Sequence, residues 1–197
     1  MYEKISIRIT NILLKNNFIS DSDINIYVYC FQIIISTIVS SLFILIWALL
    51  FDQLLNMFIF FLGFFICRKI SGGYHAETPT TCFFLTQLIF ISFALLITYS
   101  NILNSRNILM FTTIFASIVI WKLSPVDNKY NQLSNKEKIK FQKHSRLFSI
   151  INILLLIFAF FHLGFYQKYF CYILGVTAVS IMLILGKIKN LNTMKGD

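Results

Sequence analysis

The stretch INIYVYCFQIIISTIVSSLFILIWALLF, residues 24–51, contains no charged side chain. A transmembrane helix needs about 20 consecutive apolar residues, so this stretch is long enough to cross a bilayer. The whole chain of 197 residues is 57% hydrophobic and 13% charged, with 22 phenylalanines. A water-soluble core could not bury so many large side chains, and lipid must therefore be the solvent. We predict an all-α, polytopic integral membrane protein.

Five further uncharged stretches follow along the chain. They are Gln53–Cys67, Thr78–Ser105, Asn107–Trp121, Leu147–Gln167 and Tyr169–Gly186. As helices, the second and fourth of the six stretches would be only about 22 Å long, which is shorter than the hydrocarbon core of a bilayer. The basic side chains next to them would therefore have to extend to the membrane interface. We expect about six transmembrane helices; four spans with two half-inserted helices is the alternative.

The N-terminal segment, residues 1–23, is mixed and polar and has no cleavable signal-peptide pattern. Within residues 3–19, basic side chains lie on the helix face opposite an apolar stripe. The stripe comprises Ile5, Ile9, Ile12 and Leu13. This pattern predicts an amphipathic helix on the inner leaflet of the membrane. No repeat or linker is visible, so residues 1–197 are expected to form a single domain.

Basic residues separate cleanly between the two sides of a six-span arrangement. Of the 17 Lys and Arg residues, all except Arg106 and Lys168 fall on the side of the N-terminus. Basic connectors remain cytoplasmic, so both termini are expected in the cytoplasm, together with the connectors 68–81 and 122–146.

The basic connector 122–146 has two compatible roles. Its Lys136, Lys138 and Lys140 suit the anionic inner leaflet, and they could also dock an acidic peptide segment. The spacing from Ser134 to Glu137 is that of a capping box. We therefore predict a helix that starts there and continues into the span beginning at Leu147.

The connector that could carry chemistry reads RKISGGYHAETPTTC, residues 68–82. His75 and Cys82 are seven residues apart, about 10 Å along a regular helix and too far for a hydrogen bond. Pro79 lies between them and disfavours helical geometry just before it, so the chain can bend and bring imidazole and thiol together. Only a thiolate attacks a carbonyl, and a neighbouring imidazole can accept the thiol proton.

Other groups in this connector could support such a pair. A helix N-terminus at Cys82 would favour the thiolate, and the amides of Gly72 and Gly73 could form an oxyanion hole. Glu77 could orient His75, although it could equally face water. A packing role for Cys82 and a solvated His75 remain the alternative. The other cysteines, Cys30, Cys67 and Cys171, are expected to be packing residues. His144 is expected to be solvated and His162 to lie at the outer membrane interface.

Neither a metal site nor a cofactor is expected. His75, Glu77 and Cys82 could each bind zinc, but no established zinc-binding spacing is present, and a further ligand would be needed. No nucleic-acid partner is predicted either, because the basic residues are explained by membrane topology.

The pattern Arg68-x3-Gly72-Gly73-x-His75-x6-Cys82, placed after the second apolar stretch, resembles the accessory gene regulator protein B (AgrB) family. The segment from Ser124 to Asn128, followed by a Lys-rich stretch, resembles the second cytoplasmic loop of that family.

The resemblance implies a bacterial cell-membrane cysteine endopeptidase of quorum sensing that acts as a homodimer. Its substrate would be a propeptide with an amphipathic N-terminus and an acidic C-terminal tail. Cys82 would be the nucleophile and His75 the general base, with Arg68, Gly72 and Gly73 in supporting roles. The enzyme would remove the tail and cyclise the product through a thioester.

Two functions without catalysis remain as alternatives. A small transporter or exporter component would also be polytopic, although transport routes commonly use charged side chains that the apolar stretches lack. A structural membrane-interaction protein would carry His75 and Cys82 incidentally.

Overall fold

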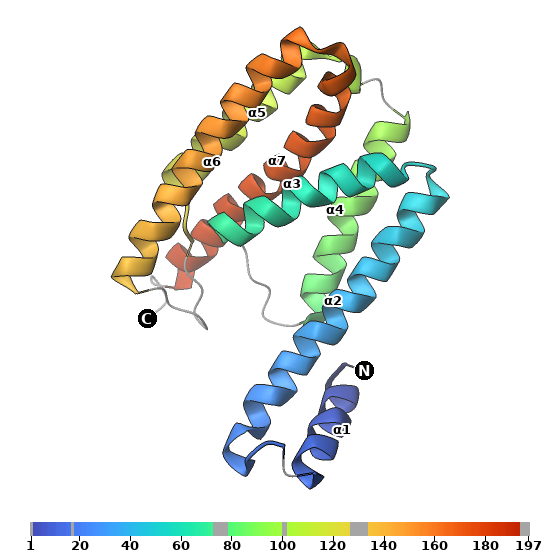
Figure 1. Ribbon diagram of the computed structural model, residues 1–197, viewed down its shortest axis with the longest axis vertical. Coiled ribbons are helices and arrows are strands. Elements are labelled where there is room, and N and C mark those ends of the chain that lie inside the picture. The colour runs from blue at the N-terminus through green and yellow to red at the C-terminus, as the bar shows by residue number, and fades with distance from the viewer. Residues whose placement is uncertain (1, 17, 73–78, 100–101, 127–133, 194–197) are drawn as a thin grey trace. The chain divides into compact units, whose positions relative to one another are not determined.

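A computed structural model describes residues 2–16, 18–72, 79–99, 102–126 and 134–193. Its helices are α1 (Tyr2–Lys15), α2 (Ile24–Leu50), α3 (Leu54–Ser71), α4 (Pro79–Tyr99), α5 (Arg106–Leu123), α6 (Asn135–Phe161) and α7 (Leu163–Thr193), with short 3-10 turns at Asp21–Asp23 and Ile102–Asn104. Figure 1 shows this succession of helices, and none of the described residues lies in a strand. The predicted all-α class is confirmed.

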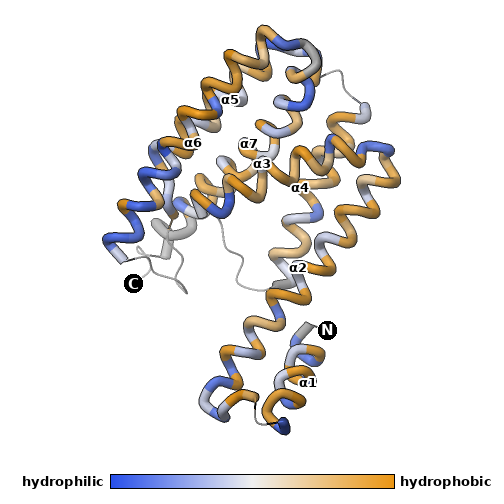
Figure 2. The backbone as a smooth tube through the Cα atoms, viewed as in Figure 1, coloured by the Kyte–Doolittle hydropathy of each residue, from blue (hydrophilic) through white to orange (hydrophobic). Residues whose placement is uncertain are grey.

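Six of these helices, α2 to α7, are long and apolar enough to cross a membrane, which makes the chain a multi-pass membrane protein. The two short stretches of the sequence become helices of 18 residues each, α3 and α5. Each is about 27 Å long, close to the thickness of the hydrocarbon core. The added length comes from turns that carry basic residues, Arg68 and Lys69 in α3 and Arg106 and Lys122 in α5. Figure 2 shows apolar residues along these helices and polar residues at the start of α6.

One predicted boundary is wrong. The charge at Lys168 suggested that the fifth stretch ends there, but the break between α6 and α7 lies at His162. Lys168 is an exposed residue inside α7. A long basic side chain can lie near a helix end and reach the interface, so its charge does not mark the turn itself.

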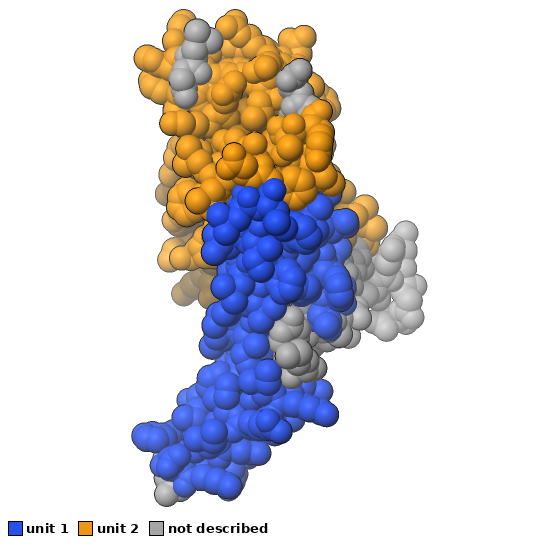
Figure 3. All heavy atoms as spheres, turned by 90° about the vertical axis from the view of Figure 1, so that its right-hand side faces the viewer, with its two compact units in different colours: residues 1–50, 76–92 blue, residues 51–75, 93–197 orange. Residues whose placement is uncertain are grey.

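The chain forms two compact units, coloured separately in Figure 3. The first comprises residues 1–50 and 76–92, and the second comprises residues 51–75 and 93–197. The boundary at residues 92 and 93 falls inside α4. The expectation of a single domain stays a prediction.

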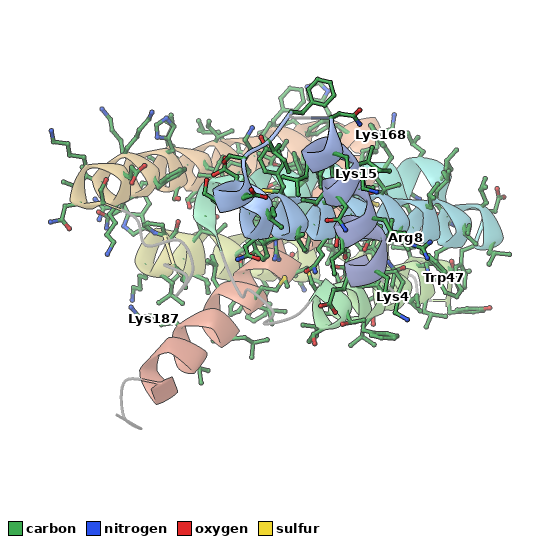
Figure 4. All side chains as sticks on the ribbon, turned by 90° about the horizontal axis from the view of Figure 1, so that it is seen from below. Lys4, Arg8, Lys15, Trp47, Lys168 and Lys187 are labelled. Atoms are coloured by element: carbon green, nitrogen blue, oxygen red, sulfur yellow. The ribbon has the colours of Figure 1, made fainter. Side chains whose placement is uncertain are left out.

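In the first unit, α1 packs on α2, and the apolar stripe of α1 is only partly buried. Ser6 and Thr10 are fully buried, and each hydroxyl donates to a backbone carbonyl of α1 itself. Short side chains at this spacing let two helix backbones approach closely. The basic residues Lys4, Arg8 and Lys15 follow one another along α1 (Figure 4). Ile5 and Ile12 stay exposed beside the packed face, where lipid can cover them.

In the second unit, α7 is the central helix and packs against α3, α5 and α6. Its buried residues include Phe170, Ile173, Val176, Val179 and Leu183. Two glycines allow α3 and α7 to touch. A Cβ atom on Gly63 would lie 2.2 Å from the Tyr172 carbonyl oxygen, and one on Gly175 would lie 2.2 Å from that of Phe60. The backbones therefore meet directly at these positions.

Candidate functional site

Cys82 lies on the first turn of α4, which begins at Pro79. Proline suits the first position of a helix, because its fixed φ is helical and its missing N–H would have no partner there. The thiol of Cys82 is free and half-exposed, and its backbone carbonyl accepts from the Thr86 hydroxyl at 2.8 Å. The predicted position of Cys82 at a helix N-terminus is confirmed. The N-terminal end of a helix carries a partial positive charge, which favours an anion such as a thiolate.

Contacts with α2 hold the N-terminal half of α4 within the first unit. The buried Gln87 side chain accepts from Trp47 Nε1 at 3.2 Å and donates to the Ser40 carbonyl at 3.3 Å. The rings of Phe43 and Phe83 meet edge to face at 5.4 Å. Gln87 thus satisfies its polar groups inside the protein, which fixes the side of α4 that packs on α2.

Three of the predicted site residues, Gly73, His75 and Glu77, lie outside the described residues. The pairing of His75 with Cys82 therefore stays a prediction. Among the part of the chain that is described, no three His, Cys, Asp or Glu side chains gather as a possible metal site. His75 and Glu77, on which a zinc site would depend, are not in that part.

Arg68 and Gly72 lie at the end of α3, in the second unit. The Arg68 guanidinium lies 5.8 Å from the centre of the Phe64 ring and contacts the Met182 sulfur at 3.2 Å. Arg68 therefore packs along α3 and α7 with its charge over an aromatic face. Gly72 ends the helix with a positive φ of 75°, and its N–H donates to the Arg68 carbonyl at 3.0 Å. Only glycine adopts this conformation without strain.

The second connector touches this helix end, a contact that the sequence did not predict. The Val126 N–H donates to the Ser71 carbonyl at 3.3 Å, and Gly72 pairs with Val126 as an isolated parallel bridge. Ser124 and Ser145 also join at 2.6 Å between their hydroxyl oxygens. Ser124 was visible only as part of a loop motif, and Ser145 carried no signal at all, because single serines have no periodic pattern.

The predicted capping box is confirmed: the Ser134 hydroxyl and the Glu137 side chain each accept from the other's backbone N–H. The helix continues without interruption into the apolar stretch. Lys136 and Lys140 are one turn apart on an exposed face, whereas Lys138 lies near the opposite side and is half-buried. The three lysines therefore do not form a single patch.

The remaining thiols and imidazoles differ in their surroundings. Cys67 and Cys171 are buried packing residues, as expected. Cys30 is exposed on α2, so the expectation that it packs within the chain is wrong. An apolar stretch predicts a helix but does not tell which of its faces meets lipid. His144 is exposed, and the exposed His162 lies at the end of α6 with its ring 4.3 Å from that of Phe158.

Taken together, the fold and the site define a multi-pass helical membrane protein with a free, half-exposed thiol at the start of one span. The family model for Accessory gene regulator B matches residues 6–183, and the chain belongs to that family.

Two curated relatives from Clostridium perfringens are both named as AgrB-like proteins. The one from strain SM101 is 32% identical over 130 residues, which are 63% of this chain and 60% of the relative. The second, from strain 13, is 32% identical over 129 residues with the same coverage. The matched part of this chain thus spans 60% of the length of each relative. No solved structure matches this one.

Proposed function

We propose that the protein is a membrane-embedded cysteine endopeptidase that trims and cyclises a quorum-sensing propeptide. The observation that carries the proposal is the half-exposed thiol of Cys82 on the first turn of α4. It stands seven residues after His75 in a chain of the AgrB family. A thiol at a helix N-terminus has the electrostatic setting that reactive cysteines use.

The first half of the reaction forms an acyl-enzyme. The His75 imidazole takes the proton of the Cys82 thiol, and the sulfur attacks the carbonyl carbon of the peptide bond before the acidic tail. The carbon–nitrogen bond of the resulting tetrahedral intermediate then breaks. The leaving amine of the tail takes the proton from the imidazolium, and the signal part remains on Cys82 as a thioester.

The second half closes the ring and restores the enzyme. A thiol or hydroxyl inside the substrate gives its proton to His75 and attacks the thioester carbonyl. The bond to the Cys82 sulfur breaks, and the sulfur recovers the proton from the imidazolium. A thiolactone or lactone leaves, and no water is consumed.

Cyclisation must be faster than hydrolysis of the thioester. A nucleophile held within the same bound substrate has an effective molarity far above that of a free competitor. A site at the membrane surface also excludes part of the water. The location of Cys82 at the end of an apolar helix supports this role.

The basic connector supports a second part of the proposal, the docking of the acidic tail. Its helical part carries Lys136, Lys138 and Lys140 on the first two turns of α6. Lys138 shares a helix face with the buried Ser145, seven residues on, whereas Lys136 and Lys140 face outward. We assign tail binding to the outward pair, Lys136 and Lys140, for which lipid headgroups compete.

Replacing Lys136 and Lys140 together by Gln should raise the KM for an acidic-tailed propeptide about fivefold and leave kcat within about twofold, because exposed ion pairs are weak individually. Steady-state cleavage in proteoliposomes measures both constants. Lys168→Gln is the control, since Lys168 is an exposed lysine on α7. An unchanged KM would show that these lysines do not bind the tail.

The orientation of the chain can be tested with added cysteines. In the proposed topology, Asn135 at the start of α6 faces the cytoplasm, and Asn107 at the start of α5 faces outward. A membrane-impermeant maleimide should label Asn107→Cys on intact cells and Asn135→Cys only after lysis. The chain without added cysteines corrects for native thiols. The reverse pattern would place the active site outside the cell.

Co-expression with a propeptide of the stated architecture tests the function itself. The endopeptidase should release the acidic tail and yield a product lighter by one water than the linear signal part, because the ring forms without hydrolysis. A transporter or a structural membrane protein would leave the precursor intact.

A further inference from the structure

The helix α1 carries three basic side chains on one exposed face, which we call the basic ridge. Lys4, Arg8 and Lys15 are all exposed, and Figure 4 shows them following one another along the helix. They are four and seven residues apart, close to one and two turns of an α-helix, so their side chains share a face. None of the three forms an ion pair with another residue of the described chain. The basic ridge is therefore uncompensated positive charge.

The basic ridge lies opposite the side of α1 that is buried in the first unit. Ser6 and Thr10 are fully buried, and α1 packs against α2. Ser6 and Arg8 are two residues apart, which places them about 200° apart around the helix. After α1 ends, the Phe18 N–H donates to the Leu13 carbonyl at 3.0 Å, where the chain turns back towards α2. The packing of α1 thus directs the ridge away from α2.

Exposed isoleucines border the basic ridge on both sides. Ile5 and Ile12 are 37% and 60% exposed on one side, and Ile7 is 39% exposed on the other. By helical spacing, each lies about 60–80° around the helix from the middle of the ridge. A surface that combines exposed cations with exposed apolar groups suits the membrane interface, where charged headgroups adjoin acyl chains.

Aromatic residues of α2 show where this interface crosses the first unit. Tyr27 and Tyr29 are exposed near the start of α2, and Trp47 lies near its end. Tyr27 and Trp47 are 20 residues apart, or about 30 Å of helix, which is the thickness of a hydrocarbon core. Tyr and Trp side chains gather at the two interfaces of a bilayer, so the two tyrosines mark one interface. Figure 1 shows α1 beside this first half of α2, which brings the basic ridge to the level of the headgroups.

We propose that the basic ridge of α1 is a binding surface for anionic phospholipids. Lys4, Arg8 and Lys15 contact the phosphate groups, and the bordering isoleucines contact the upper part of the acyl chains. Long basic side chains can reach the headgroups while their stems stay on apolar surface. The apolar borders on both sides favour a lipid over an acidic peptide, which would need only the charges. This surface goes beyond the proposed function and does not depend on catalysis.

Photo-crosslinking from the ridge tests the proposal on the full chain in vesicles. Asn11 is exposed and lies between Arg8 and Lys15 on the same face, so benzoylphenylalanine at position 11 samples the lipids that touch the ridge. The vesicles contain equal amounts of phosphatidylglycerol and phosphatidylcholine, and mass spectrometry of the α1 peptide identifies the adducts. Phosphatidylglycerol adducts should be about fivefold in excess, the effect of about one cation per headgroup. The excess should be lost near 1 M salt, where charges are screened within about 3 Å.

Charge variants separate the basic ridge from the overall charge of the protein. The combination of Lys4→Gln, Arg8→Gln and Lys15→Gln should bring the two lipid adducts to about equal amounts. The combination of Lys4→Arg, Arg8→Lys and Lys15→Arg keeps the charges and should keep the excess. A matched control removes three exposed lysines of α5 and α7 and should also keep it; its substitutions are Lys122→Gln, Lys168→Gln and Lys187→Gln. Thermal unfolding in detergent shows that each variant is folded.

Three results would overturn the proposal. Equal amounts of the two adducts on the chain with its native charges would show that the ridge does not select anionic lipid. An equal loss of the excess in the ridge variant and in the matched control would assign the selection to net charge. An acidic-tailed propeptide, added in equal amount to the protein, should leave the lipid adducts unchanged. If it replaced them at position 11, the ridge would be a peptide site and not a lipid site.

Discussion

Cys82→Ala should abolish cleavage of the propeptide, with a fall in kcat of at least about 1,000-fold, because removal of a nucleophile leaves only binding and electrostatic contributions. The thiol is half-exposed on the first turn of α4, so the loss of one sulfur should leave the packing of that helix intact. His75→Ala should lower kcat comparably, since the two groups act as a unit. Cleavage of a co-expressed propeptide, measured at equal membrane levels of each variant, checks both expectations.

The chain provides matched controls for both substitutions. Cys30 is an exposed thiol on α2, and His144 is an exposed imidazole on α6. Cys30→Ala and His144→Ala should cleave at the native rate. If Cys30→Ala lost activity and Cys82→Ala kept it, the nucleophile would be Cys30 on α2 and not Cys82 on α4. Full activity in His75→Ala would require a different general base.

Gly175→Leu should prevent stable folding of the second unit. A Cβ atom at this position would lie 2.2 Å from the Phe60 carbonyl oxygen and 2.8 Å from the Phe64 nitrogen, and both of these atoms belong to the backbone of α3. A backbone cannot rotate away as a side chain can, so the helices must separate. Overpacking costs about 1–3 kcal/mol in ordinary cores, and a backbone clash should exceed that range. The free energy of unfolding in detergent, or the yield of folded protein, measures the loss.

A matched substitution on the same helix separates this clash from a general effect of added volume. Ala178 lies three residues further along α7 and is half-exposed. Ala178→Leu should change the free energy of unfolding by less than about 1 kcal/mol. Equal losses in both variants would contradict direct contact between the backbones of α3 and α7.

The number and type of the helices could be predicted because both depend on apolar length. A charged residue marked the start of α2 well, since that helix begins directly after Asp23. Charge is misleading at Lys168, because a lysine near a helix end can remain helical. The turn at His162 carries no charge and was therefore missed. The capping box at Ser134 was readable because its two partners are three residues apart.

The contacts between distant segments could not be read in the same way. Gly63 and Gly175 look like ordinary residues of apolar stretches, and only the structure shows that α3 and α7 meet there. Ser124 and Ser145 are 21 positions apart and share no motif. In the candidate site, the place of Cys82 near a helix start followed from the uncharged stretch that begins at Thr78. The contact between Gly72 and Val126 could not be predicted in this way.

The most direct test of the account is to trap the acyl-enzyme. Native protein is mixed with a propeptide whose internal nucleophile is replaced by alanine, quenched in acid and analysed by mass spectrometry. The account predicts that the signal part of the propeptide, without its tail, is attached to the peptide that contains Cys82 through a bond that hydroxylamine cleaves. An adduct on Cys30, Cys67 or Cys171, or tail release with no adduct on Cys82, would contradict it.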